Sequence, residues 1–172
     1  ELVNAAGFKL MGYSLDGGPP SVVANGTAGL EVVSIKTLAL QATPSTGGLF
    51  NVNLPLNAPV VAPANLPSAN AATAQSAGMT SLVAYDNLGN QITLDVYSAH
   101  TGVGTWEISV FNRANAAPGG GFPYAGGPLV TQNLTFDMTN GQLTTASPKN
   151  VTVPIPNGAN LVLDMAGSSQ LG

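Results

Sequence analysis

Cysteine is absent from this sequence, and histidine and charged residues are scarce. The 172 residues include no Cys and one His, so disulfides, thiolate metal sites and cysteine nucleophiles are excluded. Only 7% of the residues are charged, against about 25% in an ordinary soluble domain. Because 44% of the residues are hydrophobic, the chain can still build a core, and we expect a folded protein.

Positive charge and long apolar runs are also lacking. The four basic residues, Lys9, Lys36, Arg113 and Lys149, are too scattered to neutralise a nucleic-acid backbone. No window approaches about 18 consecutive apolar residues, so the sequence predicts no membrane-spanning helix. Strand-like sequence starts at Glu1 with no signal peptide before it, and we expect a piece of a longer protein.

Alternation of apolar and polar residues is what the sequence contains in abundance, and it is the pattern of half-buried strands. In residues 92–97, one set is Ile92, Leu94 and Val96, and the alternate set includes Asp95. The same pattern recurs over residues 106–111, 133–138, 151–155 and 161–165. In each segment one set of side chains is predicted to face a core and the other to face water, as in antiparallel sheets. The sets predicted inside are Trp106, Ile108 and Val110; Leu134, Phe136 and Met138; Val151, Val153 and Ile155; and Leu161, Leu163 and Met165.

Turn and loop signals separate these segments. Residues 86–90 (Asp-Asn-Leu-Gly-Asn) predict a type I turn capped by the Asp86 side chain, with Gly89 in the left-handed region. The Pro-rich residues 55–78 and the Gly/Pro-rich residues 114–128, which contain Phe122 and Tyr124, predict long connections. The fold class is therefore all-β, an antiparallel sandwich or barrel of about nine strands.

No residue is predicted to be catalytic, to bind a cofactor or to hold a metal, and we expect no enzyme. His100 is the only histidine and is expected on the surface at the end of a hairpin. Asp86 and Asp95 flank one turn and invite a glycosidase interpretation or, with Asn87 and Asn90, a calcium site. Capping of the turn by Asp86 and a solvent-facing Asp95 explain these residues more simply.

Trp106, the single tryptophan, allows two interpretations. An aromatic platform for sugar would suit an extracellular carbohydrate-binding or adhesin module. A core anchor between two strands is favoured, because Trp106 shares its strand face with Ile108 and Val110.

Three stretches of the sequence carry a resemblance to a known family. The segments LVAYDNLGN (82–90), TLDVY (93–97) and TWEI (105–108) together resemble the turn-plus-tryptophan signature of bacterial flagellar hook proteins. Residues 4–13 resemble a strand pair shared by flagellar rod and hook subunits. Residues 134–143 resemble the "L.F...G.L" hairpin of the hook family. The three matches lie in the family's order and span most of the chain.

The resemblance implies a domain organisation. Hook subunits place helical termini in a tube core, followed by a β-rich middle domain with an outer β-domain inserted in it. Residues 1–41 are then expected to belong to the middle domain, residues 42–167 to form the inserted outer domain, and residues 168–172 to return to the middle domain.

The resemblance also implies a structural role as a subunit of the flagellar hook. That role would be in a helical homopolymer acting as a universal joint that transmits torque from rod to filament. The expected partners are further copies of the protein and other flagellar axial proteins at the ends of the hook, with no nucleic acid and no membrane. The expected location is outside the cell, after export without a cleaved signal peptide. The alternative is the extracellular carbohydrate-binding or adhesin module.

Overall fold

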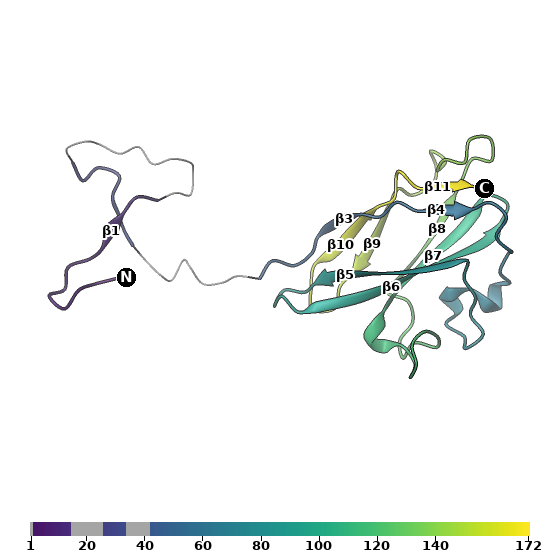
Figure 1. Cartoon of the computed structure of the whole chain (residues 1–172), viewed down its shortest axis with the longest axis horizontal. Helices are drawn as coiled ribbons and strands as arrows, with labels where there is room; N and C mark the ends of the chain where they lie inside the picture. The colour runs from purple at the N-terminus through teal and green to yellow at the C-terminus, as the bar shows by residue number, and fades with distance from the viewer. Residues whose placement is uncertain (1, 15–25, 34–41) are drawn as a thin grey trace. The chain divides into compact units, whose positions relative to one another are not determined.

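The computed structural model describes residues 2–14, 26–33 and 42–172. The chain divides into two compact units, Glu1–Gln41 and Ala42–Gly172 (Figure 1). The described residues form strands and single 3₁₀ turns, and none of them is in an α-helix. Within these residues there is accordingly no helix long and apolar enough to cross a membrane. The all-β fold class predicted from the sequence is confirmed.

The first unit has a short two-stranded ribbon. Strand β1 (Met11–Gly12) pairs antiparallel with β2 (Glu31–Val32). Asn4 closes a turn before β1, because its Oδ1 accepts the backbone N–H groups of Ala6 and Phe8.

The second unit is built from two layers of strands. One layer is an antiparallel sheet in the order β5-β6-β7-β8, with strands Gly78–Tyr85, Gln91–Gly102, Thr105–Asn112 and Val130–Thr135. The facing layer contains a three-stranded sheet, β3-β10-β9, and a two-stranded sheet, β11-β4. Their bounds are Gly47–Leu49 (β3), Asn53–Pro55 (β4), Asn150–Pro154 (β9), Asn160–Asp164 (β10) and Ser169–Leu171 (β11).

The core lies between these layers and contains the predicted apolar sets. Its buried members on the four-stranded side are Ala84, Leu94, Val96, Trp106, Ile108, Val110, Leu134 and Phe136. The facing layer contributes Leu54, Val151, Val153, Ile155, Leu161, Leu163 and Met165. Met138 was wrongly predicted to face the core and is 51% exposed. The chain has already turned at Asp137, whose Oδ1 accepts the backbone N–H of Thr139.

The facing layer contains two strand pairings that alternation did not predict. Strand β3 pairs with β10 in parallel, and β4 pairs with β11 in parallel. Among the described strands the sheets stay open, so the sandwich form of the prediction fits and the barrel form does not. Strand β11 lies inside the second unit, where Ser169–Leu171 pairs with β4.

Candidate functional site

Trp106 lies in the core of the second unit. Its side chain is fully buried, and across the sheet it pairs with His100 on β6 and Leu134 on β8. A sugar platform requires an aromatic ring that a ligand can reach. The core interpretation of Trp106 is therefore confirmed, and the sugar interpretation loses its aromatic residue.

His100 is buried, so the prediction of a surface histidine is wrong. Its ring stacks on Trp106, with the ring centroids 5.0 Å apart. Its Nδ1 donates to the carbonyl oxygen of Ala58, 2.6 Å away, and its own carbonyl accepts the N–H of Val61. Nε2 is buried without a hydrogen-bond partner in the described part of the chain. His100 therefore ties the Pro-rich segment to the end of β6.

Asp86 caps the turn between β5 and β6 as predicted. Its Oδ1 accepts the backbone N–H groups of Leu88 and Asn90, and its Oδ2 accepts from the Asn90 side chain. Gly89 has a φ of 79°, in the left-handed region. The Asn90 side chain lowers the pKa of the Asp86 carboxyl most, and the backbone N–H groups lower it further against the opposing effect of burial.

The outer face of the four-stranded sheet is covered rather than wet. Tyr97 on β6 and Phe111 on β7 belong to the sets of side chains that were predicted to face water. They pack with Tyr124 in a second buried cluster, and the partly buried Phe122 packs against this cluster. The rings of Phe111 and Tyr124 stack with centroids 4.4 Å apart. Phe122 and Tyr124 belong to the 114–128 loop, which therefore lies on the sheet as a lid.

Asp95 lies beneath the 114–128 loop and accepts a hydrogen bond from it, so the prediction that Asp95 faces solvent is wrong. Its side chain is buried, and it accepts hydrogen bonds from Ser81 Oγ at 2.7 Å and Tyr124 OH at 2.8 Å. Arg113 Nε lies 3.1 Å from Oδ1. Burial raises the pKa of the Tyr124 phenol, and hydrogen bonds with Tyr97 and Asp95 raise it further. The phenol therefore stays protonated as a donor to the carboxylate.

Glu107 on β7 likewise accepts hydrogen bonds from a loop, and it is also buried, although it was predicted to face water. Its two carboxylate oxygens accept the backbone N–H and the hydroxyl of Ser68, at 3.0 and 2.7 Å. Ser109 Oγ donates to Oε1 as well, at 2.9 Å. Asn70, two residues after Ser68, holds the other loop: its side-chain oxygen accepts the backbone N–H of Tyr124, and its side-chain nitrogen donates to the Tyr124 carbonyl oxygen. The 55–78 and 114–128 segments are thus fastened to the sheet and to each other.

These carboxylates are not arranged for acid–base catalysis. Tyr85 pairs with Gln91 and Ser81 with Asp95, so Asp95 lies four residue steps from the turn that Asp86 caps, about 13 Å along the strand. Asp95 and Glu107 are separated by a similar distance, since Glu107 pairs with Ala99. Within the described residues, no three His, Asp or Glu side chains come together in a way that could hold a metal ion. The arrangement fastens loops.

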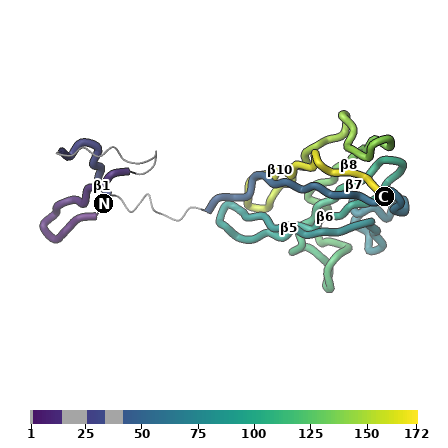
Figure 2. The backbone as a smooth tube through the Cα atoms, turned by 45° about the horizontal axis from the view of Figure 1, so that its top comes forward, coloured from purple at the N-terminus to yellow at the C-terminus, as the bar shows by residue number. Residues whose placement is uncertain are grey.

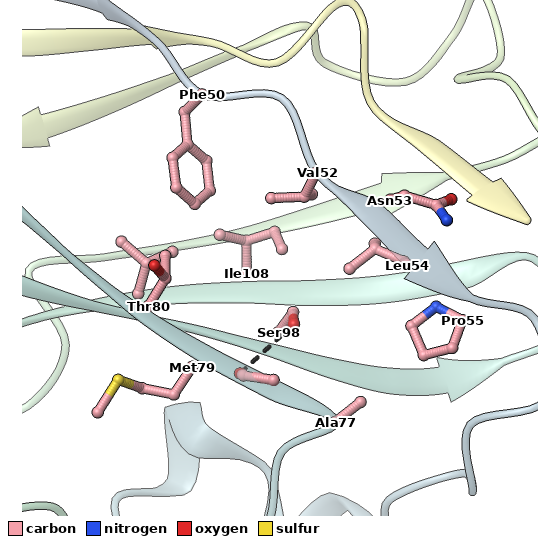
Figure 3. A pocket seen from close by; sticks show the side chains of 12 residues that line it. Phe50, Val52, Asn53, Leu54, Pro55, Ala77, Met79, Thr80, Ser98 and Ile108 are labelled. Atoms are coloured by element: carbon pink, nitrogen blue, oxygen red, sulfur yellow. Dashed lines mark hydrogen bonds between the residues drawn. The ribbon is translucent and has the colours of Figure 1, made fainter.

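An apolar pocket of about 220 Å³ opens at one side of the sandwich. Figure 3 shows Phe50, Val52 and Leu54 on one side of it and Met79 and Thr80 of β5 on the other, with Ile108 between. The Ser98 hydroxyl, which donates to the Gly78 carbonyl oxygen, is one of its few polar groups. Its lining contains no ionisable side chain, so it offers no acid–base chemistry.

The residues that fasten the loops were missed at the level of sequence. Ser68 and Tyr124 bond to strand residues 39 and 29 positions away along the chain, and Asn70 bonds to Tyr124 of the other loop, 54 positions away. The one local signal was a pair of aromatic residues, Phe122 and Tyr124, inside a Gly/Pro-rich loop. Aromatic rings in such a loop indicate an apolar surface nearby that they cover.

The fold and these contacts define an all-β module whose buried ionisable side chains hold its loops in place. Residues 53–171 match the family model of the flagellar basal body protein FlaE D2 domain, and the chain belongs to this family. The predicted relationship to flagellar hook proteins is confirmed. The hook protein family is a structural one.

Curated relatives cover the whole chain. The flagellar hook protein FlgE of Brucella abortus is 35% identical over 170 residues, which is 99% of this chain and 37% of that protein. The flagellar hook protein FlgE of Rhizobium meliloti is 34% identical over 178 residues, which is 100% of this chain and 39% of that protein. The chain thus spans less than two fifths of the length of these relatives.

Proposed function

We propose that this chain is part of a structural subunit of the bacterial flagellar hook. In this role, copies of the full-length protein assemble into a helical homopolymer that acts as a flexible universal joint between rod and filament. The observation that carries the proposal is the match of residues 53–171 to the FlaE D2 domain, together with full coverage by hook proteins. No catalytic activity is proposed for it.

The charge distribution of the second unit supports this role. Its charged residues are Asp86, Asp95, Glu107, Arg113, Asp137, Lys149 and Asp164. Asp86, Asp95 and Glu107 are buried, so a surface that is already poor in charge loses three more ionised groups. In a joint that bends as it rotates, subunits must exchange contacts. Uncharged polar contacts exchange at low cost, whereas charge pairs fix register and partner.

The same proposal extends to partners, location and domains. The partners are further copies of the full-length protein and other flagellar axial proteins at the two ends of the hook. The location is the hook, outside the cell, reached by export without a cleaved signal peptide. Residues 1–41 are assigned to the middle domain, residues 42–167 to the inserted outer domain, and residues 168–172 to the return into the middle domain.

Electron microscopy of cells that lack the parent gene tests the proposal. We expect basal bodies without hooks, and hooks again when the intact gene is supplied. Complementation with a second gene that lacks residues 53–171 then shows whether hooks form without this domain. Normal hooks in the deletion strain would overturn the proposal.

The adhesin or carbohydrate-binding alternative has no observation in its favour. Its one candidate residue, Trp106, is fully buried. A glycan array probed with this chain tests the alternative directly. Binding to a defined sugar that is retained in a control variant with an exposed substitution, such as Tyr85→Ala, would favour the carbohydrate-binding interpretation again.

A further inference from the structure

The chain enters and leaves the second unit along neighbouring strands that run in the same direction. Gly47–Leu49 (β3) runs parallel to β10, and Asn53–Pro55 (β4) runs parallel to β11. The segment that leads into β3 therefore lies at one end of the unit and the residues after β11 at the other. Figure 1 shows this arrangement, with the C-terminal label beside β4 and β11, and in Figure 2 the C-terminal label again lies at the end of the unit away from the dark blue start of its chain.

Hydrogen bonds join these two segments over their whole common length. We call residues 46–56 and 162–171 the parallel clamp. Its backbone bonds outside the named strands run from Val162 N to Thr46 O, Phe50 N to Asp164 O, Ser169 N to Val52 O and Leu56 N to Leu171 O, at 2.8 to 3.2 Å. Side chains bridge the stretch between β3 and β4, where the ladder is interrupted. Gly167 N donates to Asn51 Oδ1, Val52 N to Ser168 Oγ, and Ser169 Oγ to Asn53 Oδ1.

We propose that the parallel clamp is a mechanical device that keeps the second unit folded when the chain is pulled from both sides. Tension between residue 42 and residue 172 pulls the two segments past each other along their own direction. All the bonds of the clamp are then strained together. Force applied at right angles to the strands would instead open the bonds one after another.

The inference goes beyond the proposed function. It does not depend on that function, because the geometry belongs to this chain and a force measurement tests it without a hook. Failure of the force test would leave the proposed function in place. A hook-forming role disproved by microscopy would leave the clamp in place.

Single-molecule pulling in two directions tests the geometry. The chain has no cysteine, so handles can be attached at introduced ones. Thr43→Cys with Gly172→Cys pulls along the clamp, and Thr43→Cys with Asn160→Cys pulls its two segments apart from one end. Thr43, Asn160 and Gly172 are all exposed. We expect a clearly higher unfolding force for the first pair at the same loading rate, and equal or lower force would overturn the proposal.

A matched pair of serine substitutions tests the clamp bonds themselves. Ser168 and Ser147 are both buried, and each Oγ accepts one backbone N–H, from Val52 in the clamp and from Thr135 outside it. Under constant force between residues 43 and 172, Ser168→Ala should unfold about fivefold faster, the rate equivalent of about 1 kcal/mol. Ser147→Ala should unfold at nearly the parent rate, although both variants lose similar stability in urea.

Equal acceleration by the two serine variants would contradict the proposal, because the rupture would then not start in the clamp. If Ser168→Ala does not fold, Asn51→Ala replaces it. Asn51 is exposed, and its Oδ1 accepts the N–H of Gly167 within the clamp. Loss of this hydrogen bond in Asn51→Ala should also speed unfolding under force between residues 43 and 172, and an unchanged unfolding rate would count against the proposal.

Discussion

Trp106 is the residue on which the core of the second unit depends most. Its side chain is fully buried within the main apolar cluster, which contains residues of both layers of the sandwich. Trp106→Ala should lower the free energy of unfolding by about 3–5 kcal/mol, because it leaves a large cavity. Urea unfolding followed by circular dichroism measures this. Tyr85→Ala, at a half-exposed ring on β5, should cost less than about 1 kcal/mol.

A Trp106→Ala loss as small as that of Tyr85→Ala would mean that the indole is accessible in solution. The sugar-binding alternative would then regain its candidate residue.

Asp86 and Asp137 should make the second unit sensitive to acid. Hydrogen bonds lower the pKa of both carboxyls in the folded state, from Asn90 in the first case and Thr139 in the second. A lowered folded-state pKa stabilises the protein above the unfolded value of about 3.9, and this stability is lost as pH falls through the folded value. Asp86→Asn should therefore flatten the decline of stability below about pH 4. Urea unfolding at several pH values measures the slope, and an unchanged slope would disprove the assignment.

Residue roles were predictable where they depend on neighbours in sequence. The Asp86 cap follows from five consecutive residues, and the burial of Trp106 follows from its place on one strand face. His100, Asp95 and Glu107 could not be placed, because alternation says which face a side chain is on and not what covers that face. The covering groups come from loops 29 to 42 residues away along the chain.

At the scale of the element, the 114–128 loop should depend on the phenol of Tyr124. That hydroxyl donates to Asp95 and lies 2.9 Å from the Tyr97 hydroxyl, in a buried setting. Tyr124→Phe should cost about 1–3 kcal/mol, the range for a lost hydrogen bond to a buried charge. It should also speed amide exchange across residues 113–128.

Tyr85→Phe is the control for this prediction, because the Tyr85 ring is half-exposed on the edge strand β5. Exchange mass spectrometry of both variants makes the comparison. An exchange rate in the loop that does not change in Tyr124→Phe would show that ring packing alone holds the loop.

The strands were predictable in proportion to their alternation. Residues 92–97, 151–155 and 161–165 alternate and form β6, β9 and β10. Strand β3 is Gly47–Leu49, with every residue exposed, and β4 ends in Pro55, so neither shows a strand pattern. Their parallel partners lie more than 110 residues further along the chain, and local sequence holds no information on such a pairing.

At the scale of the whole molecule, the two units should differ in stability. In the first unit, β1 and β2 have two residues each, and Phe8 and Leu10 are mostly exposed. A two-stranded ribbon is marginal in water, whereas the second unit has two layers around a continuous core. We expect amides in residues 2–14 and 26–33 to exchange by local opening and those of β6 and β7 only by unfolding of the second unit. Exchange mass spectrometry resolves the two regions, while the fluorescence of Trp106 reports the second unit alone. Equal protection of residues 8–13 and 94–110 would show that the two units unfold together.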